Sequence, residues 1–188
     1  MTTLEIHPLR RIDWPRLREL MAGYTSAQRY AVRKEESQAQ SVITLTLETL
    51  AQPYSKNYGD CLNDEDRRRY EGYLAAGLSL GAYLDGHWVG VALAEAQRWN
   101  SVLLVWEFHI HPAQRRQGIG RRLMEALAEC ASTAGLRALA VETQNTNVGA
   151  IRFYRSVGFT LESVDLSLYG NHDVEEGEVA LILRRKLT

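Results

Sequence analysis

The segment Arg115-Arg-Gln-Gly-Ile-Gly120 joins a β-rich stretch, residues 101–111, to an amphipathic helical stretch. Pro112 ends the strand, because proline cannot donate to a strand ladder. Gly118 and Gly120 allow a tight turn and bring bare backbone N–H groups close to a ligand. These groups lie at a helix N-terminus, where the helix dipole favours anions. The segment therefore predicts a strand–loop–helix unit whose loop can bind a pyrophosphate.

Arginines surround this loop, and they leave two interpretations open. They are Arg115, Arg116, Arg121 and Arg122. Clustered arginines favour phosphate binding, but they are equally typical of a solvated surface. No Gly-Lys-Ser/Thr follows, so the loop is not a Walker loop, and its glycine spacing is too short for a dinucleotide-binding fingerprint.

The rest of the chain alternates between strand and helix patterns. Apolar runs predict strands at residues 4–9, 78–84, 88–94, 101–111, 139–142, 160–169 and 178–184. Helical spacing predicts helices at residues 13–24, 64–76, 119–134 and 148–157. Asp13 and Pro15 are start signals of the first helix, and Asp85-Gly86 is a hairpin turn signal.

Residues 25–63 show no clean period, and we expect a partly helical excursion there, with Val42, Leu45 and Leu47 as core contacts. The order of elements predicts an α/β (α+β) fold, with a mixed central sheet of roughly six to seven strands flanked by about four helices. The length fits a single domain covering residues 1–188.

Composition narrows the class of protein. The 188 residues carry 22 basic and 23 acidic side chains, so the chain lacks the basic excess of a general nucleic-acid binder. Cys61 and Cys130 are too few for a disulfide framework, and we expect Cys130 to be a small core residue. The N-terminus has no secretion signal, and the apolar runs are shorter than the ~20 residues of a membrane span. We therefore expect a cytoplasmic protein without nucleic-acid or membrane partners.

A second motif follows the strand at residues 139–142. It runs from Asn147 to Phe159 and contains Ala150, Phe153-Tyr154 and Gly158. Ala150 and Tyr154 lie four residues apart, so they share a helix face. By spacing alone, Phe153, Tyr154 and Phe159 fit an ordinary apolar core as well as a binding site.

Together, the two motifs resemble those of the GNAT superfamily of acetyl-CoA-dependent N-acetyltransferases. There, a Gln/Arg-x-x-Gly-x-Gly/Ala loop binds the CoA pyrophosphate, and an Asn…Ala…Phe-Tyr…Gly-Phe segment follows the next strand. The resemblance covers residues 78–185 and implies the GNAT fold, acetyl-CoA as cosubstrate and no metal. Residues 141–147, 165–169 and 178–180 look like the streptothricin (nourseothricin) acetyltransferase branch, which acetylates an amine of the antibiotic's β-lysine. Trp106-Glu107 departs from that branch, since paired acids would be expected there.

The resemblance also implies which residues hold acetyl-CoA. The backbone from Phe108 to Ile110 would run along the pantetheine arm, with the N–H of Ile110 aimed at the thioester oxygen. The loop would hold the pyrophosphate, and Arg121 and Arg122 are candidates for the 3′-phosphate. The implied cofactor-binding residues are Phe108, His109, Ile110, Arg115, Arg116, Gln117, Gly118, Ile119, Gly120, Arg121, Asn147, Ala150, Phe153 and Tyr154.

Amide formation also needs a proton donor and a proton acceptor. Tyr154 is the candidate donor to the departing thiolate; a tyrosine pKa near 10 is about 1.5 units above that of a thiol, so hydrogen bonding describes its role better than full transfer. Glu107 is the first candidate for the base, Glu142 the second, and pairing of Glu107 with a cationic amine is an open alternative. Glu107 and His109 share one strand face. His109 and His111 lack a third metal ligand nearby.

We expect acetyl transfer from acetyl-CoA to a primary amine of a small, cationic molecule, such as a streptothricin-like antibiotic, by direct attack in a ternary complex. Aromatic and acidic residues of the N-terminal half either suit such an acceptor by charge and cation–π contact or merely cover the surface. They are Tyr54, Tyr58, Asp60, Asp64, Glu65, Tyr70 and Tyr73.

Two alternatives to a small-amine enzyme stay open. One is a peptide or protein N-α or lysine acetyltransferase, and the other is a non-catalytic acyl-CoA-binding regulatory module on the same fold. Within the single acetyltransferase domain, we expect the segment 25–63 to lie at the substrate side. The terminal strands and exposed aromatic residues allow a homodimer.

Overall fold

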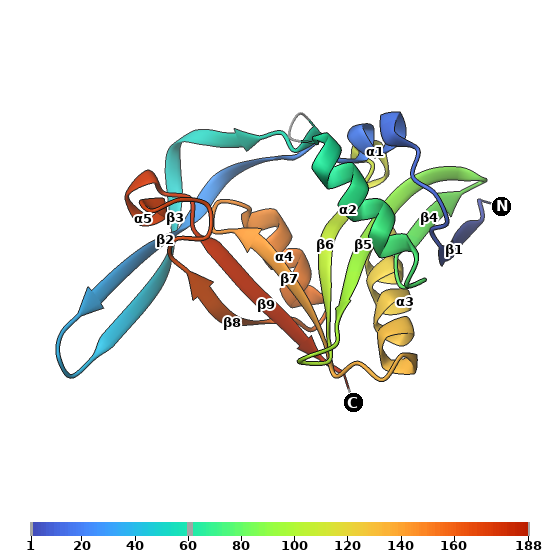
Figure 1. The fold of residues 1–188 in the computed structure, drawn as a ribbon. Helices are drawn as coiled ribbons and strands as arrows, with labels where there is room; N and C mark the ends of the chain where they lie inside the picture. The colour runs from blue at the N-terminus through green and yellow to red at the C-terminus, as the bar shows by residue number, and fades with distance from the viewer. Residues whose placement is uncertain (1, 60–61, 188) are drawn as a thin grey trace. The chain divides into compact units, whose positions relative to one another are not determined.

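The computed structural model describes residues 2–59 and 62–187. Seven strands form a mixed sheet in the order β1-β4-β5-β6-β7-β9-β8, and β2 and β3 form a second, two-stranded sheet (Figure 1). The described residues also form five α-helices and a short 3₁₀ helix, Pro112–Gln114. The mixed α/β class and the seven strands confirm the sequence prediction. Among the described residues, no helix has the length and apolar character that crossing a membrane requires.

The bounds of the elements follow the chain. The large sheet consists of β1 (Leu4–Pro8), β4 (Leu80–Leu84), β5 (His87–Gln97), β6 (Val102–Ile110), β7 (Ala138–Gln144), β8 (Thr160–Asp165) and β9 (Ala180–Lys186). The small sheet consists of β2 (Tyr24–Glu36) and β3 (Ser41–Lys56). The helices are α1 (Trp14–Leu20), α2 (Asp64–Leu74), α3 (Ile119–Thr133), α4 (Val148–Ser156) and α5 (Asp173–Glu176).

The chain packs into two compact units. The described part of unit 1 comprises residues 2–23, 57–59, 62–141 and 185–187, and unit 2 comprises residues 24–56 and 142–184. The assignment of residues 1–188 to one domain stays a prediction.

Residues 24–56 correct the sequence prediction. In place of a partly helical excursion at 25–63, β2 and β3 form a long antiparallel hairpin, paired from Tyr24–Lys56 to Glu36–Ser41. A two-stranded sheet leaves both faces partly open to water, so neither face requires a continuous apolar pattern. This explains why the segment shows no clean period. Of the expected core contacts, Val42 and Leu45 are half-buried and Leu47 is exposed.

In unit 1, an apolar cluster holds α1 and α2 against one face of β5. Leu17 and Leu20 of α1 and Tyr70 of α2 pack with Val91 and Leu93. In Figure 1, α2 lies in front of β5 and β6. The cluster therefore holds α2 over the part of the sheet that contains Glu107 of β6.

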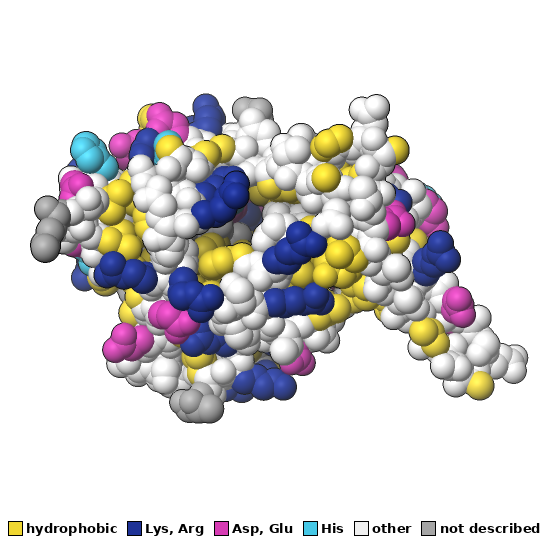
Figure 2. All heavy atoms as spheres, turned by 180° about the vertical axis from the view of Figure 1, so that it is seen from behind, with side chains coloured by type: hydrophobic (Ala, Val, Ile, Leu, Met, Phe, Trp, Pro, Cys, Tyr) yellow, Lys and Arg dark blue, Asp and Glu magenta, His cyan; other side chains and the backbone are white. Residues whose placement is uncertain are grey.

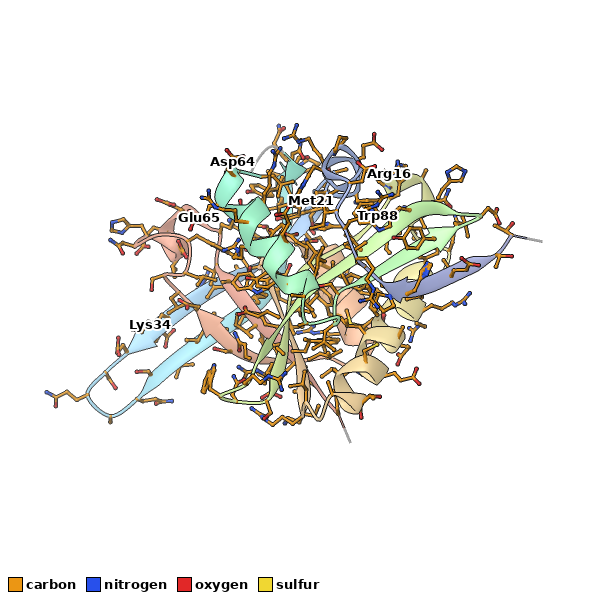
Figure 3. All side chains as sticks on the ribbon, turned by 45° about the vertical axis from the view of Figure 1, so that its right-hand side comes forward. Arg16, Met21, Lys34, Asp64, Glu65 and Trp88 are labelled. Atoms are coloured by element: carbon orange, nitrogen blue, oxygen red, sulfur yellow. The ribbon has the colours of Figure 1, made fainter. Side chains whose placement is uncertain are left out.

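Helix α1 starts where the sequence predicts and ends earlier. Asp13 is its N-cap and accepts a hydrogen bond from the N–H of Arg16, at 3.1 Å. The Arg16 side chain donates to the carbonyl oxygen of Trp88 at 2.9 Å, which ties α1 to β5 (Figure 3). The predicted end at Tyr24 is wrong, because Tyr24 already belongs to β2.

Helix α3 covers the other face of the sheet. Leu123, Met124 and Leu127 are fully buried, and α3 contacts β4, β5 and β6. Ala92 and Ala94 point away from the α1–α2 face and are also buried, as packing against α3 requires. Cys130 is half-buried rather than a core residue, and burial raises the pKa of its thiol. Cys61 lies outside the described residues.

Unit 2 is organised around the buried side chain of Asn145. Its Nδ2 donates to the carbonyl oxygens of Tyr30 (2.8 Å) and Gly177 (3.3 Å), and its Oδ1 accepts from the N–H of Val179 (2.8 Å). Its backbone also accepts from the N–H of Tyr30 and donates to Val179, both at 2.9 Å. One residue thus joins the end of β7 to β2 and to the segment before β9.

The residues beside Asn145 make similar bonds. Thr146 Oγ1 lies 2.6 Å from the hydroxyl of Tyr24, and Gln144 Nε2 donates to the hydroxyl of Tyr169 at 3.1 Å. The Tyr169 hydroxyl donates to the carboxylate of Glu142. Burial and the Glu142 charge raise the pKa of Tyr169, which keeps its hydroxyl a donor. Residues 142–146 therefore connect several segments of unit 2 by side-chain hydrogen bonds.

We expect Asn145→Ala to lower the free energy of unfolding by about 3 kcal/mol, because the buried Val179 N–H and the half-buried carbonyls of Tyr30 and Gly177 lose their partner. Urea unfolding followed by far-UV circular dichroism measures this. Gln52→Ala, at an exposed position of β3, serves as control and should change stability by less than about 0.5 kcal/mol. Equal stabilities of the two variants would contradict the role of Asn145.

Candidate functional site

A register shift in β6 places the polar residues of the candidate site. Leu93 of β5 pairs with Glu107, whereas Ala94 pairs with Val105, so Trp106 is an extra residue in β6. Side chains alternate along a strand, and one inserted residue reverses the alternation. Glu107 consequently shares a face with Leu93, which is the face that α2 covers.

The carboxylate of Glu107 is held from two sides. The hydroxyl of Tyr70, on α2, donates to Oε1, and Nε2 of His109 lies 2.6 Å from Oε2. The His109 and Glu107 side chains are only 12% and 16% exposed. Burial and the Glu107 charge raise the pKa of Tyr70, so its hydroxyl stays a donor. The arrangement is a nearly buried, doubly hydrogen-bonded carboxylate beside an imidazole.

Aromatic rings surround this carboxylate. Tyr73 stacks on Trp106, with ring centroids 6.1 Å apart and an interplanar angle of 8°. The indole N–H of Trp106 donates to Glu95 at 3.0 Å, and the ring centroid of Tyr58 lies 5.8 Å from that of His109. The guanidinium of Arg69 lies 4.9 Å from the Trp106 ring centroid. The face thus combines aromatic rings with the carboxylates of Glu107 and Glu95 and the guanidinium of Arg69.

Only some of the aromatic and acidic residues of the N-terminal half that the structure describes lie near Glu107. Tyr58, Tyr70 and Tyr73 gather near Glu107. Asp64 and Glu65 lie exposed at the N-terminal end of α2 (Figure 3), where negative charge complements the helix dipole. Tyr54 belongs to unit 2, where its hydroxyl donates to Glu178 at 3.4 Å. Asp60 lies outside the described residues.

Sequence reasoning identified Glu107 but not its partner Tyr70. A signal existed: Tyr70 and Tyr73 are spaced i, i+3 on α2, so they share a helix face. A tyrosine on a core-facing stripe needs a partner for its hydroxyl. The partner itself depends on the register of β6, which the sequence pattern does not contain.

The loop between β6 and α3 has the conformation that its glycines allow. Arg116 has a φ of 61°, and Gly118, the N-cap of α3, has a φ of 80°. Gly118 has no side chain to cap the helix. The N–H groups of the first turn of a helix point out of its N-terminus, where they attract anions. The loop geometry therefore fits the predicted pyrophosphate site.

Arg115 and Gln117 have structural contacts within the loop. Arg115 donates through Nε to the carbonyl of Ile110 (3.0 Å) and through Nη2 to that of Gly23 (3.2 Å). Burial lowers the pKa of Arg115. Gln117 Nε2 donates to the carbonyl of Ala113 at 3.2 Å. In this structure, Arg115 thus fixes the end of β6, and the helix N-terminus carries the anion-binding potential.

Lys and Arg side chains are numerous on the face shown in Figure 2. In unit 1, an open groove along α3 includes Arg121 and Arg122, the candidates for the 3′-phosphate. Arg122 Nη2 donates to the carbonyl of Leu4 at 3.3 Å. Arg185, in the same groove, pairs with both oxygens of Glu125, at 3.0 and 2.7 Å. Part of the positive charge is therefore neutralised within the protein.

In unit 2, α4 carries the second sequence motif. Asn147 is its N-cap, and its Oδ1 accepts from the N–H of Ala150 at 3.1 Å. Tyr154 is buried, with ring centroids 5.5 Å from Phe153 and 5.6 Å from Phe159. Asn147 thus has a structural role that spacing alone did not reveal.

Comparison with known proteins identifies the family. Residues 43–159 match the acetyltransferase (GNAT) family. The chain belongs to this family. The GNAT fold expected from the resemblance is thereby confirmed.

Two curated relatives are streptothricin acetyltransferases. The chain is 36% identical to the enzyme of Streptomyces lavendulae over 99 residues, which cover 53% of this chain and 52% of that protein. It is 30% identical to streptothricin acetyltransferase A of Bacillus subtilis (strain 168) over 130 residues, covering 69% and 72%. The match to the first of these relatives thus spans about half of its length.

Solved structures show the same fold along the whole chain. A nourseothricin acetyltransferase superposes with a TM-score of 0.72 at 25% identity, covering 100% of this chain and 99% of that one. A protein of Bacillus anthracis in complex with acetyl coenzyme A superposes with a TM-score of 0.76 at 23% identity, covering 99% of each chain.

We expect Gly118→Ala to lower the free energy of unfolding by about 1 kcal/mol, because a residue with a Cβ is strained at positive φ. Gly72→Ala is the matched control. A Cβ meets nothing within 4 Å at either position, and only Gly118 has a positive φ. In α2, Gly72→Ala should raise stability by about 0.5–1 kcal/mol. Thermal unfolding of both variants measures the difference, and a stabilised Gly118→Ala would contradict the assigned conformation.

Proposed function

We propose that the chain transfers the acetyl group of acetyl-CoA to a primary amine of a small, cationic molecule, with a streptothricin-like antibiotic as first candidate. The observation that carries this proposal is the nearly buried Glu107, held between Tyr70 and His109 on β6. Membership of the GNAT family and similarity to streptothricin acetyltransferases support it. The reaction is a direct attack of the amine in a ternary complex.

Strand β6 and the loop after it are the proposed acetyl-CoA site. β6 pairs in parallel with β7 only from Val102–Ala138 to Val105–Val141 and then continues through Ile110. In the proposal, this second half of β6, including Phe108, runs along the pantetheine arm. The N–H of Ile110 would polarise the thioester oxygen, a role worth about 3 kcal/mol in oxyanion sites.

The first turn of α3 would bind the pyrophosphate. Its N-cap, Gly118, presents backbone without a side chain, and Arg116 is an exposed cation beside it. Arg121 and Arg122 remain the candidates for the 3′-phosphate. Asn147, whose Oδ1 caps α4, is a further candidate for contact with the CoA arm.

The acceptor must lose a proton before it attacks. An alkylammonium with a pKa near 10.4 lies about 3.4 units above pH 7, which corresponds to about 4.6 kcal/mol. An anion beside the amine attracts the cation, and a base removes its proton. Glu107 and its neighbour His109 supply both groups on one strand face. Glu142 is the second candidate for the base.

The aromatic surroundings of Glu107 favour a cationic acceptor. Tyr58 lies beside His109, Tyr73 stacks on Trp106, and Glu95, which accepts from the indole N–H of Trp106, is a second carboxylate. Cations are attracted to the faces of such rings. A small, positively charged amine fits this chemistry.

We expect an amine panel, assayed by release of the CoA thiol, to show the highest kcat/KM with streptothricin. The panel also contains aminoglycosides, polyamines, amino acids and short peptides. Faster acetylation of peptide N-termini would instead assign a peptide acceptor. Binding of acetyl-CoA without transfer to any amine would indicate a non-catalytic module.

We expect Tyr154→Phe to lower kcat by about 10²-fold, because the departing thiolate loses its proton donor. The affinity for acetyl-CoA, measured by calorimetry, should stay within about twofold, since the ring remains. Tyr30→Phe is the control, because it removes another hydroxyl of unit 2, one that accepts from Arg155. An unchanged kcat in Tyr154→Phe would exclude this tyrosine from the mechanism.

A further inference from the structure

Glu107, the first candidate for the base, is poorly suited to accept a proton. Both of its carboxylate oxygens have a partner: Tyr70 donates to Oε1, and His109 Nε2 lies at 2.6 Å from Oε2. Hydrogen bonds to a carboxylate stabilise its charged form and weaken it as a base. A proton arriving at Glu107 would have to displace one of these bonds.

His109, in contrast, has a ring nitrogen that can accept a proton. A carboxylate only accepts hydrogen bonds, so the short contact with Glu107 requires the proton of the neutral ring to be on Nε2. The lone pair of neutral His109 is then on Nδ1. No hydrogen bond to Nδ1 is found among residues 2–59 and 62–187. The ring therefore keeps an available acceptor on the α2 side of the sheet.

The groups around the ring favour its protonated form after transfer. Glu107 is the anion in contact with it, and Tyr70 fixes that carboxylate from α2. The ring centroids of Tyr58 and His109 are 5.8 Å apart, and the ring planes are inclined by 57°. Val91 of β5, an apolar residue, pairs with His109 across the sheet. A histidinium formed here would face one carboxylate and aromatic or apolar neighbours.

On α2, Arg69 and Asp66 form an ion pair. Arg69 donates to Asp66 at 2.6 Å, and its guanidinium lies over the rings of Tyr70 and Trp106. Glu107 is the charged group in direct contact with the ring, and the Arg69–Asp66 pair belongs to α2.

We propose that His109 accepts the proton of the attacking amine and that Glu107 is the positioning residue that orients its ring. This inference rests on the proposed function and reassigns the base within the same site. The amine nitrogen forms a bond to the thioester carbonyl carbon while one of its protons moves to Nδ1 of His109. The C–S bond breaks, and the thiolate takes up a proton from its donor, Tyr154, which regains one from solvent. The imidazolium then releases its proton to solvent, and Glu107 stays ionised throughout.

The test compares His109→Gln, which keeps an N–H donor for Glu107, with Glu107→Gln and Tyr70→Phe. We expect His109→Gln to lower kcat by about 10²-fold or more with little change in KM. Glu107→Gln should lower kcat by about tenfold, and Tyr70→Phe by less, because the base is retained in both. His111→Gln, at the residue after β6, is the control and should leave kcat unchanged.

The pH profile separates catalysis from mere stability. A base in the site predicts that kcat falls as the pH is lowered, because the protonated base cannot accept the proton of the amine. In Glu107→Gln the imidazolium has lost its anion, so this fall should move to lower pH. Free imidazole should restore part of the activity of His109→Gly, which removes the ring but tests the same position.

Opposite results would overturn the inference and leave the proposed function intact. They are an activity of His109→Gln within about threefold of the wild type, or loss of activity in Glu107→Gln at every pH while His109→Gln stays active. A wild-type protein that acetylates no amine would instead refute the proposed function. Lack of imidazole rescue, in a folded His109→Gly with the wild-type affinity for acetyl-CoA, would also contradict a proton-accepting His109.

Discussion

The extra residue in β6, Trp106, determines which side chains of that strand reach the α2 face. If the pairing of Leu104 with Glu95 continued without a shift, Glu107 would lie opposite Ala92, on the face that packs against α3. A carboxylate buried there without partners would cost several kcal/mol. With the shift, Glu107 lies on the α2 face instead, where the hydroxyl of Tyr70 donates to its carboxylate.

Two other residues of the candidate site also stabilise the local structure. Arg115 anchors the end of β6, and Asn147 caps α4. Asn145 has no role in the proposed chemistry, yet its side chain joins three segments of unit 2. Buried polar groups are stable only when they are hydrogen bonded, so such residues tolerate few replacements.

Local signals predicted the elements that depend on local physics. Asp85 and Gly86 both have positive φ, 49° and 79°, as the hairpin turn between β4 and β5 requires. Helix α3 begins at Ile119 and α4 at Val148, both as predicted, with Gly118 and Asn147 as their N-caps. The hairpin of β2 and β3 escaped prediction, because its two faces are both partly exposed and its length depends on cross-strand pairing.

The sequence by itself determined the family, the order of most strands and helices, and the two motifs at the starts of α3 and α4. These features follow from periodicity, glycine conformation and helix capping, which act over a few residues. Only the tertiary structure decided that Tyr70 and His109 hold Glu107 and that Asn145 joins β2 to β7. Those contacts link residues far apart along the chain and depend on strand register, and a shift of one residue reverses every side chain that follows.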